Sequence, residues 1–196
     1  MLARGGRMDE IPAWWMESGC PIVDGMRMSQ PEFWMRGVTV DGISPALQPV
    51  AHALLQAMED LEGAVSGLSV DELWTKPGGA ASAGFHLCHL AGSLDRLTTY
   101  ARGEALSRTQ LAALRSEQEP GASAAELLAH ARATVDRVLD QLRATPDASL
   151  DEPRHVGRAR LPSSVRGLLY HAGEHTSRHT GQVITTVKVV RGLAGG

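Results

Sequence analysis

Cysteine, aromatic residues and long apolar runs are all scarce in this chain of 196 residues. Its two cysteines, Cys20 and Cys88, lie far apart and form no CxxC pair, which argues against a disulfide framework and a zinc ribbon. No apolar stretch approaches the roughly 18 residues that cross a bilayer, and the first residues do not read as a secretory signal. We therefore expect a cytoplasmic protein that does not bind membranes.

The chain also lacks an excess of positive charge. Nineteen lysines and arginines are opposed by twenty-two aspartates and glutamates, which gives a formal net charge of −3. Non-specific binding to nucleic acid or to an anionic membrane needs a basic surface. We therefore expect a small-molecule substrate and no nucleic-acid partner.

Residues 1–43 differ in character from the rest of the chain. They hold three of the four tryptophans and six of the seven methionines, and no helical or alternating period persists in them. This segment is interpreted as an irregular N-terminal arm, which packs on the main domain at 44–196 or on a partner subunit. A translation start at Met26 or Met28 is an alternative explanation.

After residue 43, four long segments repeat apolar residues every three or four positions, which predicts four amphipathic helices. Residues 109–117 predict a further short helix, and the proline-containing stretch at 145–162 predicts a long loop. No convincing strand pattern is present, so the sequence predicts an all-α protein built as a four-helix bundle. The predicted boundaries are Pro45 for the first helix, Ser82 and Gly103 for the second, Ser123 with a capping box to Glu126 for the third, and Ser163 or Ser164 to about Arg191 for the fourth.

Histidines gather on two of these predicted helices. His171, His175 and His179 are spaced by four residues, and His86 precedes His89 by three. His89, His175 and His179 fall on the apolar stripes, so they are expected to face the core. Imidazole nitrogens bind Zn²⁺ or Ni²⁺, and an HxxxH pair on one helix fits one ion. The spacing favours a divalent metal site, with a hydrogen-bonded polar cluster in a core or interface as the alternative.

Two stretches of the sequence carry a family resemblance. FHLCHLAGSLDRLTTYARGE and, some seventy residues on, LLYHAGEHTSRHTGQ together resemble the DinB-like superfamily of four-helix-bundle metalloenzymes. The resemblance covers roughly residues 34–192. It implies an up-down-down-up bundle with a long crossover, and metal ligands at His89, His175 and His179. Because members of the superfamily often dimerise, a homodimer is also expected.

Four further residues are candidates for the catalytic machinery, namely His86, His171, Arg96 and Gln182. The two histidines are expected to act as an acid or base near the metal, as positioning partners or as extra ligands. Arg96 lies two turns beyond His89 and would orient a substrate or form an inter-helix ion pair. Gln182 follows His179 by one turn, where it would orient an imidazole or a bound water.

Three histidine ligands leave a divalent ion with an open position, which is typical of catalytic sites. Characterised relatives include bacillithiol transferases and mycothiol-dependent maleylpyruvate isomerases. The resemblance therefore implies a metal-dependent thiol S-transferase or isomerase, in which Zn²⁺ or Ni²⁺ activates a low-molecular-weight thiol. Two alternatives stay open. One is a metal-dependent hydrolase with Glu174 as its base. The other is a non-catalytic metal-binding or stress-response bundle, in which His86 or Cys88 would be a fourth ligand that fills the open position on the metal.

Overall fold

The computed structural model describes residues 31–194, and the chain from Glu32 onward forms one compact unit. Most of the expected N-terminal arm lies outside the described residues, as do Cys20, Met26 and Met28. The elements, in chain order, are η2 (Phe33–Arg36), α2 (Gln48–Val65), α3 (Val70–Trp74), η3 (Pro77–Gly79), α4 (Ala83–Ala101), α5 (Arg108–Ser116), α6 (Ala124–Ala144), η4 (Asp147–Ser149), β1 (Pro153–Val156), β2 (Leu161–Ser164) and α7 (Val165–Ala194). None of the helices within 31–194 combines the length and apolarity that a membrane crossing requires.

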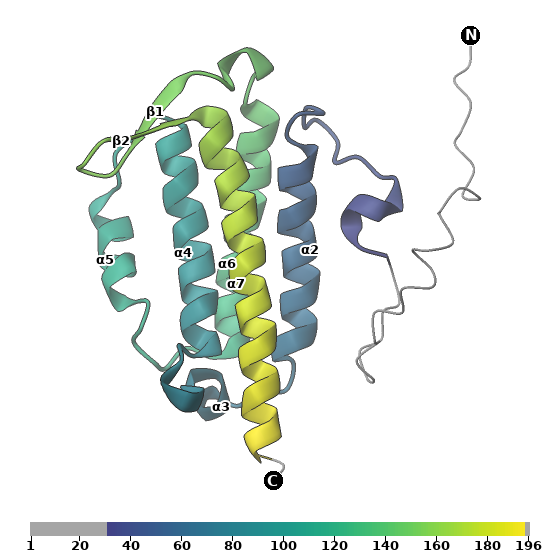
Figure 1. Ribbon diagram of the computed structural model, residues 1–196, viewed down its shortest axis with the longest axis vertical. Coiled ribbons are helices and arrows are strands. Elements are labelled where there is room, and N and C mark those ends of the chain that lie inside the picture. Colours follow the sequence, from purple (N-terminus) through teal and green to yellow (C-terminus); the bar gives the residue numbers. More distant parts are fainter. Residues whose placement is uncertain (1–30, 195–196) are drawn as a thin grey trace. The chain divides into compact units, whose positions relative to one another are not determined.

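Helices α2, α4, α6 and α7 form a four-helix bundle (Figure 1). Helix α7 packs against α2 and α4, and α6 packs against the same two helices from the other side. Helices α2 and α7 run in one direction, whereas α4 and α6 run in the other. The crossover that joins the parallel helices α4 and α6 contains α5. The predicted all-α bundle with an up-down-down-up order is thereby confirmed.

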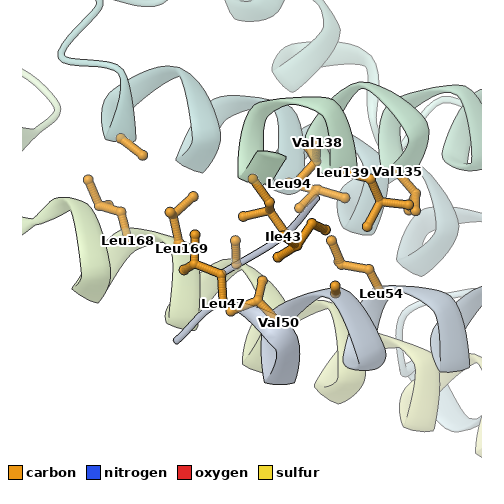
Figure 2. Packing of buried hydrophobic residues seen from close by; sticks show 14 of the residues in the cluster. Ile43, Leu47, Val50, Leu54, Leu94, Val135, Val138, Leu139, Leu168 and Leu169 are labelled. Carbon is orange, nitrogen blue, oxygen red and sulfur yellow. The ribbon is translucent and has the colours of Figure 1, made fainter. Parts of the chain in front are cut away.

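All four helices contribute leucines and valines to one apolar cluster, together with the segment that leads into α2. Figure 2 shows part of this cluster, including Ile43, Leu47, Val50, Leu54, Leu94, Val135, Val138, Leu139, Leu168 and Leu169. A second cluster lies toward the other ends of α2 and α7. On α7 the buried residues of the first cluster end at Ala172 and those of the second begin at Val183. The HxxxH pair of α7 therefore occupies the interval between two apolar clusters.

Capping side chains lie at the predicted starts of helices α4, α6 and α7. The Ser82 hydroxyl accepts a hydrogen bond from the N–H of Phe85 at the start of α4. At the start of α6, Ser123 and Glu126 form the predicted capping box. Helix α7 begins directly after Ser164, whose hydroxyl accepts a hydrogen bond from a backbone N–H of the first turn. Each bond satisfies a donor that the helix itself leaves unpaired.

The predicted loop at 145–162 is wrong in part, because this stretch contains η4 and most of a β-hairpin. Strands β1 and β2 pair antiparallel, with Pro153 opposite Ser164 and Val156 opposite Leu161. Four-residue strands are too short to show a period of two in the sequence. Prolines are tolerated here because both strands of a two-stranded sheet are edges, where a missing N–H removes little pairing.

Candidate metal centre

Three histidines converge between helices α4 and α7. His89 comes from α4, His175 and His179 come from successive turns of α7, and one ring nitrogen of each lies within 4.8 Å of the others. The Nε2 atoms of His89 and His175 are 3.2 Å apart. Two nitrogens that bind one tetrahedral Zn²⁺ at about 2.0–2.1 Å are roughly 3.4 Å from each other. The observed spacing therefore fits two ligands of a shared ion.

The buried threonines near the histidines on α7 are satisfied within their own helix. The hydroxyl of Thr176 donates to the carbonyl of Ala172, and that of Thr180 donates to the carbonyl of Thr176. Both side chains are almost fully buried. Since these hydroxyls bond to the helix backbone, the histidine rings are left as the polar groups that face α4.

A buried carboxylate, Glu117, contacts the outer side of His89. Its Oε2 lies 2.7 Å from His89 Nδ1, and its Oε1 accepts a hydrogen bond from Arg96 Nη1 at 2.6 Å. Burial by itself raises the pKa of Glu117, but the hydrogen bonds from His89 and Arg96 outweigh it and lower the pKa below its usual range. A carboxylate that accepts from Nδ1–H leaves the Nε2 lone pair of the ring free for a metal.

Glu117 reaches this position because the crossover brings it against α4. It directly follows α5, and a Cβ at Gly92 would lie only 2.6 Å from Glu117 Oε1 and 2.8 Å from Arg96 Nη1. His89, Gly92 and Arg96 share one face of α4 at spacings of three and four. The sequence analysis did not identify Glu117. The signal in the sequence is Gly92, which lies between His89 and Arg96 on one face of α4. A glycine there leaves room for a side chain from another segment.

Burial favours the neutral imidazole at His179, His175 and His86. Burial is the largest cause of the lowered pKa of His179, and the neighbouring His175, His89 and His86 add to the shift, which brings the pKa to about 4. Burial is also the main cause of the lowered pKa of His175 and of His86, with an added contribution from His89. A neutral imidazole can bind a metal without first losing a proton. His175 Nδ1 is moreover buried with no hydrogen-bond partner in the described part of the chain. The lowered pKa of His175 and this unpaired ring nitrogen fit a site that binds a metal.

The four other predicted site residues separate into two pairs. His86 and Arg96 are buried, and His86 Nδ1 lies 3.1 Å from His179 Nδ1 while Arg96 binds Glu117. His171 and Gln182 are exposed. His171 Nδ1 lies 3.1 Å from Glu174 Oε2, and its ring centroid lies 5.3 Å from that of His175. The catalytic and positioning roles expected for these residues stay predictions.

Two further candidates from the sequence, Glu174 as a base and Cys88 as a ligand, do not belong to the cluster of three histidines. The Glu174 carboxylate is about half exposed, and Arg178 and His171 pair with it at the surface of α7. Cys88 packs against the second apolar cluster. Burial, helped by the charge of Glu117, raises the pKa of the Cys88 thiol to about 11. The thiol is therefore protonated at neutral pH in the absence of a metal, and it does not belong to the group of side chains whose ligand atoms converge.

A cavity of about 230 Å³ lies near the start of helix α4, beside Phe85. Its lining includes Phe85 and Gln118, and Lys76 supplies a positive charge. The ring of Phe85 stacks on that of His89, with centroids 5.5 Å apart and planes inclined by 17°. Gln118 directly follows the carboxylate that holds His89. The cavity therefore borders the ring that stacks on His89 and has room for a small ligand, but it is not lined by any of the three clustered histidines.

Comparisons with known proteins agree with this arrangement. A family model described as the DinB superfamily matches residues 53–183, a span that includes all three clustered histidines. The crystal structure of a conserved protein from Enterococcus faecalis is similar over 74% of this chain and 96% of that chain, with a TM-score of 0.58 and 19% sequence identity. At that identity the likeness shows the shared fold. No curated protein sequence matches the chain.

Proposed function

The chain belongs to the DinB superfamily, and from that premise we propose that it is a metal-dependent enzyme whose His89, His175 and His179 bind one divalent ion. The observation that carries the proposal is the convergence of three imidazoles from two helices within 4.8 Å. Imidazole ligands suit Zn²⁺ and Ni²⁺. We name these two ions as the preferred metals.

Neighbouring side chains prepare two of the three rings for this role. Glu117 accepts from His89 Nδ1, and His86 contacts His179 Nδ1, which leaves the Nε2 atom of each ring available. Arg96 compensates the buried charge of Glu117. When bound, the ion would supply an electrophilic centre that lowers the pKa of a thiol and presents it as a thiolate.

The surroundings favour a thiol over water as the nucleophile. Metal-dependent hydrolysis is helped by a carboxylate base near the attacking water. Within residues 31–194, Glu117 has both oxygens engaged by His89 and Arg96, and Glu174 is paired at the surface. A thiol, whose ordinary pKa is about 8.5, needs no protein base once it is bound to a cation.

We therefore assign the chain to thiol S-transfer or thiol-dependent isomerisation. The cavity beside Phe85 is where a small electrophile would lie, next to the ring that stacks on His89. Lys76 would pair with a carboxylate on that substrate, because an ammonium group forms strong charge-assisted hydrogen bonds with anions. This arrangement would hold the two reactants next to each other, which lowers the entropic part of the barrier.

Elemental analysis of the tag-free protein tests the metal site. We expect about one transition-metal ion per chain in the native protein and almost none in a His175→Ala/His179→Ala variant. His130→Ala/His155→Ala is the matched control, because both of these histidines are exposed and should leave the metal content unchanged. A native protein that takes up neither Zn²⁺ nor Ni²⁺ on reconstitution would refute the site.

Thiol reactivity tests the reaction class. Metal-loaded protein is mixed with bacillithiol, mycothiol, glutathione or cysteine and with monobromobimane as the electrophile. We expect one of these thiols to react faster at pH 7, and the acceleration to vanish in the apoprotein and in the double variant. Full metal loading without acceleration for any thiol would support the non-catalytic alternative. Thiol-independent hydrolysis of p-nitrophenyl acetate would instead support the hydrolase.

A further inference from the structure

A second and larger cavity, of about 690 Å³, lies near the opposite end of helix α4. Its walls come from the end of α4, from α5 and from the β1–β2 hairpin. Tyr100, which lines it, stands eleven residues after His89 on the same helix, a distance of about 16 Å along the axis. This cavity is therefore a separate place from the metal centre.

Positive charge dominates the lining. Four arginines contribute, Arg115 from α5 and Arg154, Arg158 and Arg160 from the hairpin, against one acidic residue, Glu104. Glu104 is already paired with an arginine outside the lining. Arg115 and Arg158 have no hydrogen-bond or ion-pair partner within the described residues. Such a concentration of cations is unexpected in a chain whose formal net charge is −3.

Two of the three hairpin arginines, Arg154 and Arg160, make contacts that restrict their side chains, whereas Arg158 makes none within the described residues. Arg154 Nε donates to the carbonyl of Ala101 at 2.8 Å, and the same guanidinium pairs with Glu152 at 2.9 Å. Arg160 has a φ of 48°, a left-handed conformation that is uncommon outside glycine, and its Nη2 lies 3.3 Å from His155 Nδ1. The guanidinium groups of Arg154 and Arg160 are therefore held at defined positions on the hairpin.

The remaining wall is apolar. Leu106 and Leu111 line the cavity together with the ring of Tyr100. Leu111 is 41% exposed, although it is a leucine on an amphipathic helix. A cavity of this size with apolar walls and a few convergent charged groups is the usual form of a small-molecule site.

We propose that this cavity binds a small organic anion, with its oxyanion group between Arg115 and Arg158 and its apolar body against Leu111 and Tyr100. Guanidinium groups form charge-assisted hydrogen bonds with carboxylate, phosphate and sulfonate alike. A nucleic-acid strand would need an extended basic track, whereas these arginines surround one cavity.

Fluorescence titration with 1-anilinonaphthalene-8-sulfonate tests this site, with N-phenyl-1-naphthylamine as a neutral probe of the same ring system. We expect one sulfonate per chain, bound more tightly than the neutral probe. Arg115→Gln/Arg158→Gln should weaken sulfonate binding by about tenfold or more. Arg132→Gln/Arg137→Gln, which removes two charges from α6, is the matched control and should change little. Both double variants should keep the native circular dichroism spectrum.

Equal affinity for the two probes, or an equal loss in the control variant, would overturn the proposal. Tighter binding of a single-stranded oligonucleotide with a steep salt dependence would assign the arginines to nucleic acid and also overturn it. Displacement of the probe by octanoate or by octyl phosphate identifies which head group the site prefers. His175→Ala/His179→Ala should leave probe binding intact, so failure here is distinguishable from failure of the metal proposal.

Discussion

At His89, the two nitrogens of one ring serve different partners. Nε2 faces His175 across the helix interface, and Nδ1 is held by Glu117, which Arg96 holds in turn. The chain Arg96–Glu117–His89 fixes both the tilt of the ring and the nitrogen that carries its proton. Partners of this kind, behind the ligands, set metal affinity nearly as strongly as the ligands themselves.

Glu117→Gln should lower metal affinity by about 10- to 100-fold, because an amide binds Nδ1–H more weakly and fixes the ring less firmly. Glu119→Gln, an exposed neighbour, is the control and should bind normally. Competition with a chromophoric chelator measures both affinities. Gly92→Ala should act in the same direction, since its methyl group would displace the carboxylate. Native affinity in both folded variants would show that Glu117 has no influence on the site.

The pairing of His175 with His179 could be predicted from the sequence because their spacing is local, whereas the set of proposed ligands that includes His89 came from the family resemblance. His175 and His179 are one turn apart, so helical geometry alone places them on one face. Glu117 could not be predicted in this way. It lies 28 residues from His89 at the end of a short exposed helix, and only the path of the crossover brings the two together.

At the scale of elements, helix α4 packs against the Trp74 ring of α3 at Gly84. A Cβ there would lie 2.7 Å from the ring of Trp74. That ring has little freedom to move, since its Nε1 donates to the carbonyl of Ala122 at 2.9 Å. The absence of a side chain at Gly84 is therefore required by packing, although the residue lies within a helix.

Gly84→Ala should destabilise the protein by about 1–3 kcal/mol through overpacking against Trp74. Gly63→Ala is the matched control, because a Cβ there meets nothing within 4 Å. Alanine should stabilise that position by roughly 0.5–1 kcal/mol through helix propensity. Urea unfolding of the two variants measures the difference. Stabilisation by both substitutions would mean that the Trp74 ring moves aside without cost.

Helices α4, α6 and α7 were predictable because each carries a long apolar stripe and begins after a serine cap, whereas α2 has the stripe but no side-chain cap. The starts at Ser82 and Ser123 depend on bonds within four residues, so sequence alone specifies them. The hairpin depends on pairing between 153–156 and 161–164 and on two left-handed residues in its turn, Gly157 and Arg160. A left-handed arginine has no signal in the sequence, which is why this stretch reads as a loop.

At the scale of the whole molecule, the HxxxH pair of α7 lies between residues of the two apolar clusters, and its histidines meet His89 of the neighbouring helix α4. A metal bound there would join α4 to α7 across 86 residues of sequence. The amphipathic stripes predict a bundle, but they do not say which helices are neighbours. The order of the helices followed from the family resemblance, and the expected homodimer stays a prediction.

Removal of metal should lower the free energy of unfolding. The ion binds the native state, whereas in the unfolded chain the ligands are no longer arranged to bind it. At a free metal concentration 100 times Kd, the loss on chelation is about 2.7 kcal/mol. Thermal unfolding with and without EDTA measures it, and His175→Ala/His179→Ala should show no response to EDTA. An equal response in that variant would mean that EDTA acts elsewhere.

The position of α7 as the last described helix also has a consequence for biosynthesis. His89 is made early, whereas His175 and His179 leave the ribosome only after the other three bundle helices are complete. A nascent chain therefore lacks two of the three proposed ligands until α7 has been made. Metal binding would therefore follow translation of the bundle. The ion would stabilise a fold that apolar contacts have already assembled and would not direct its folding.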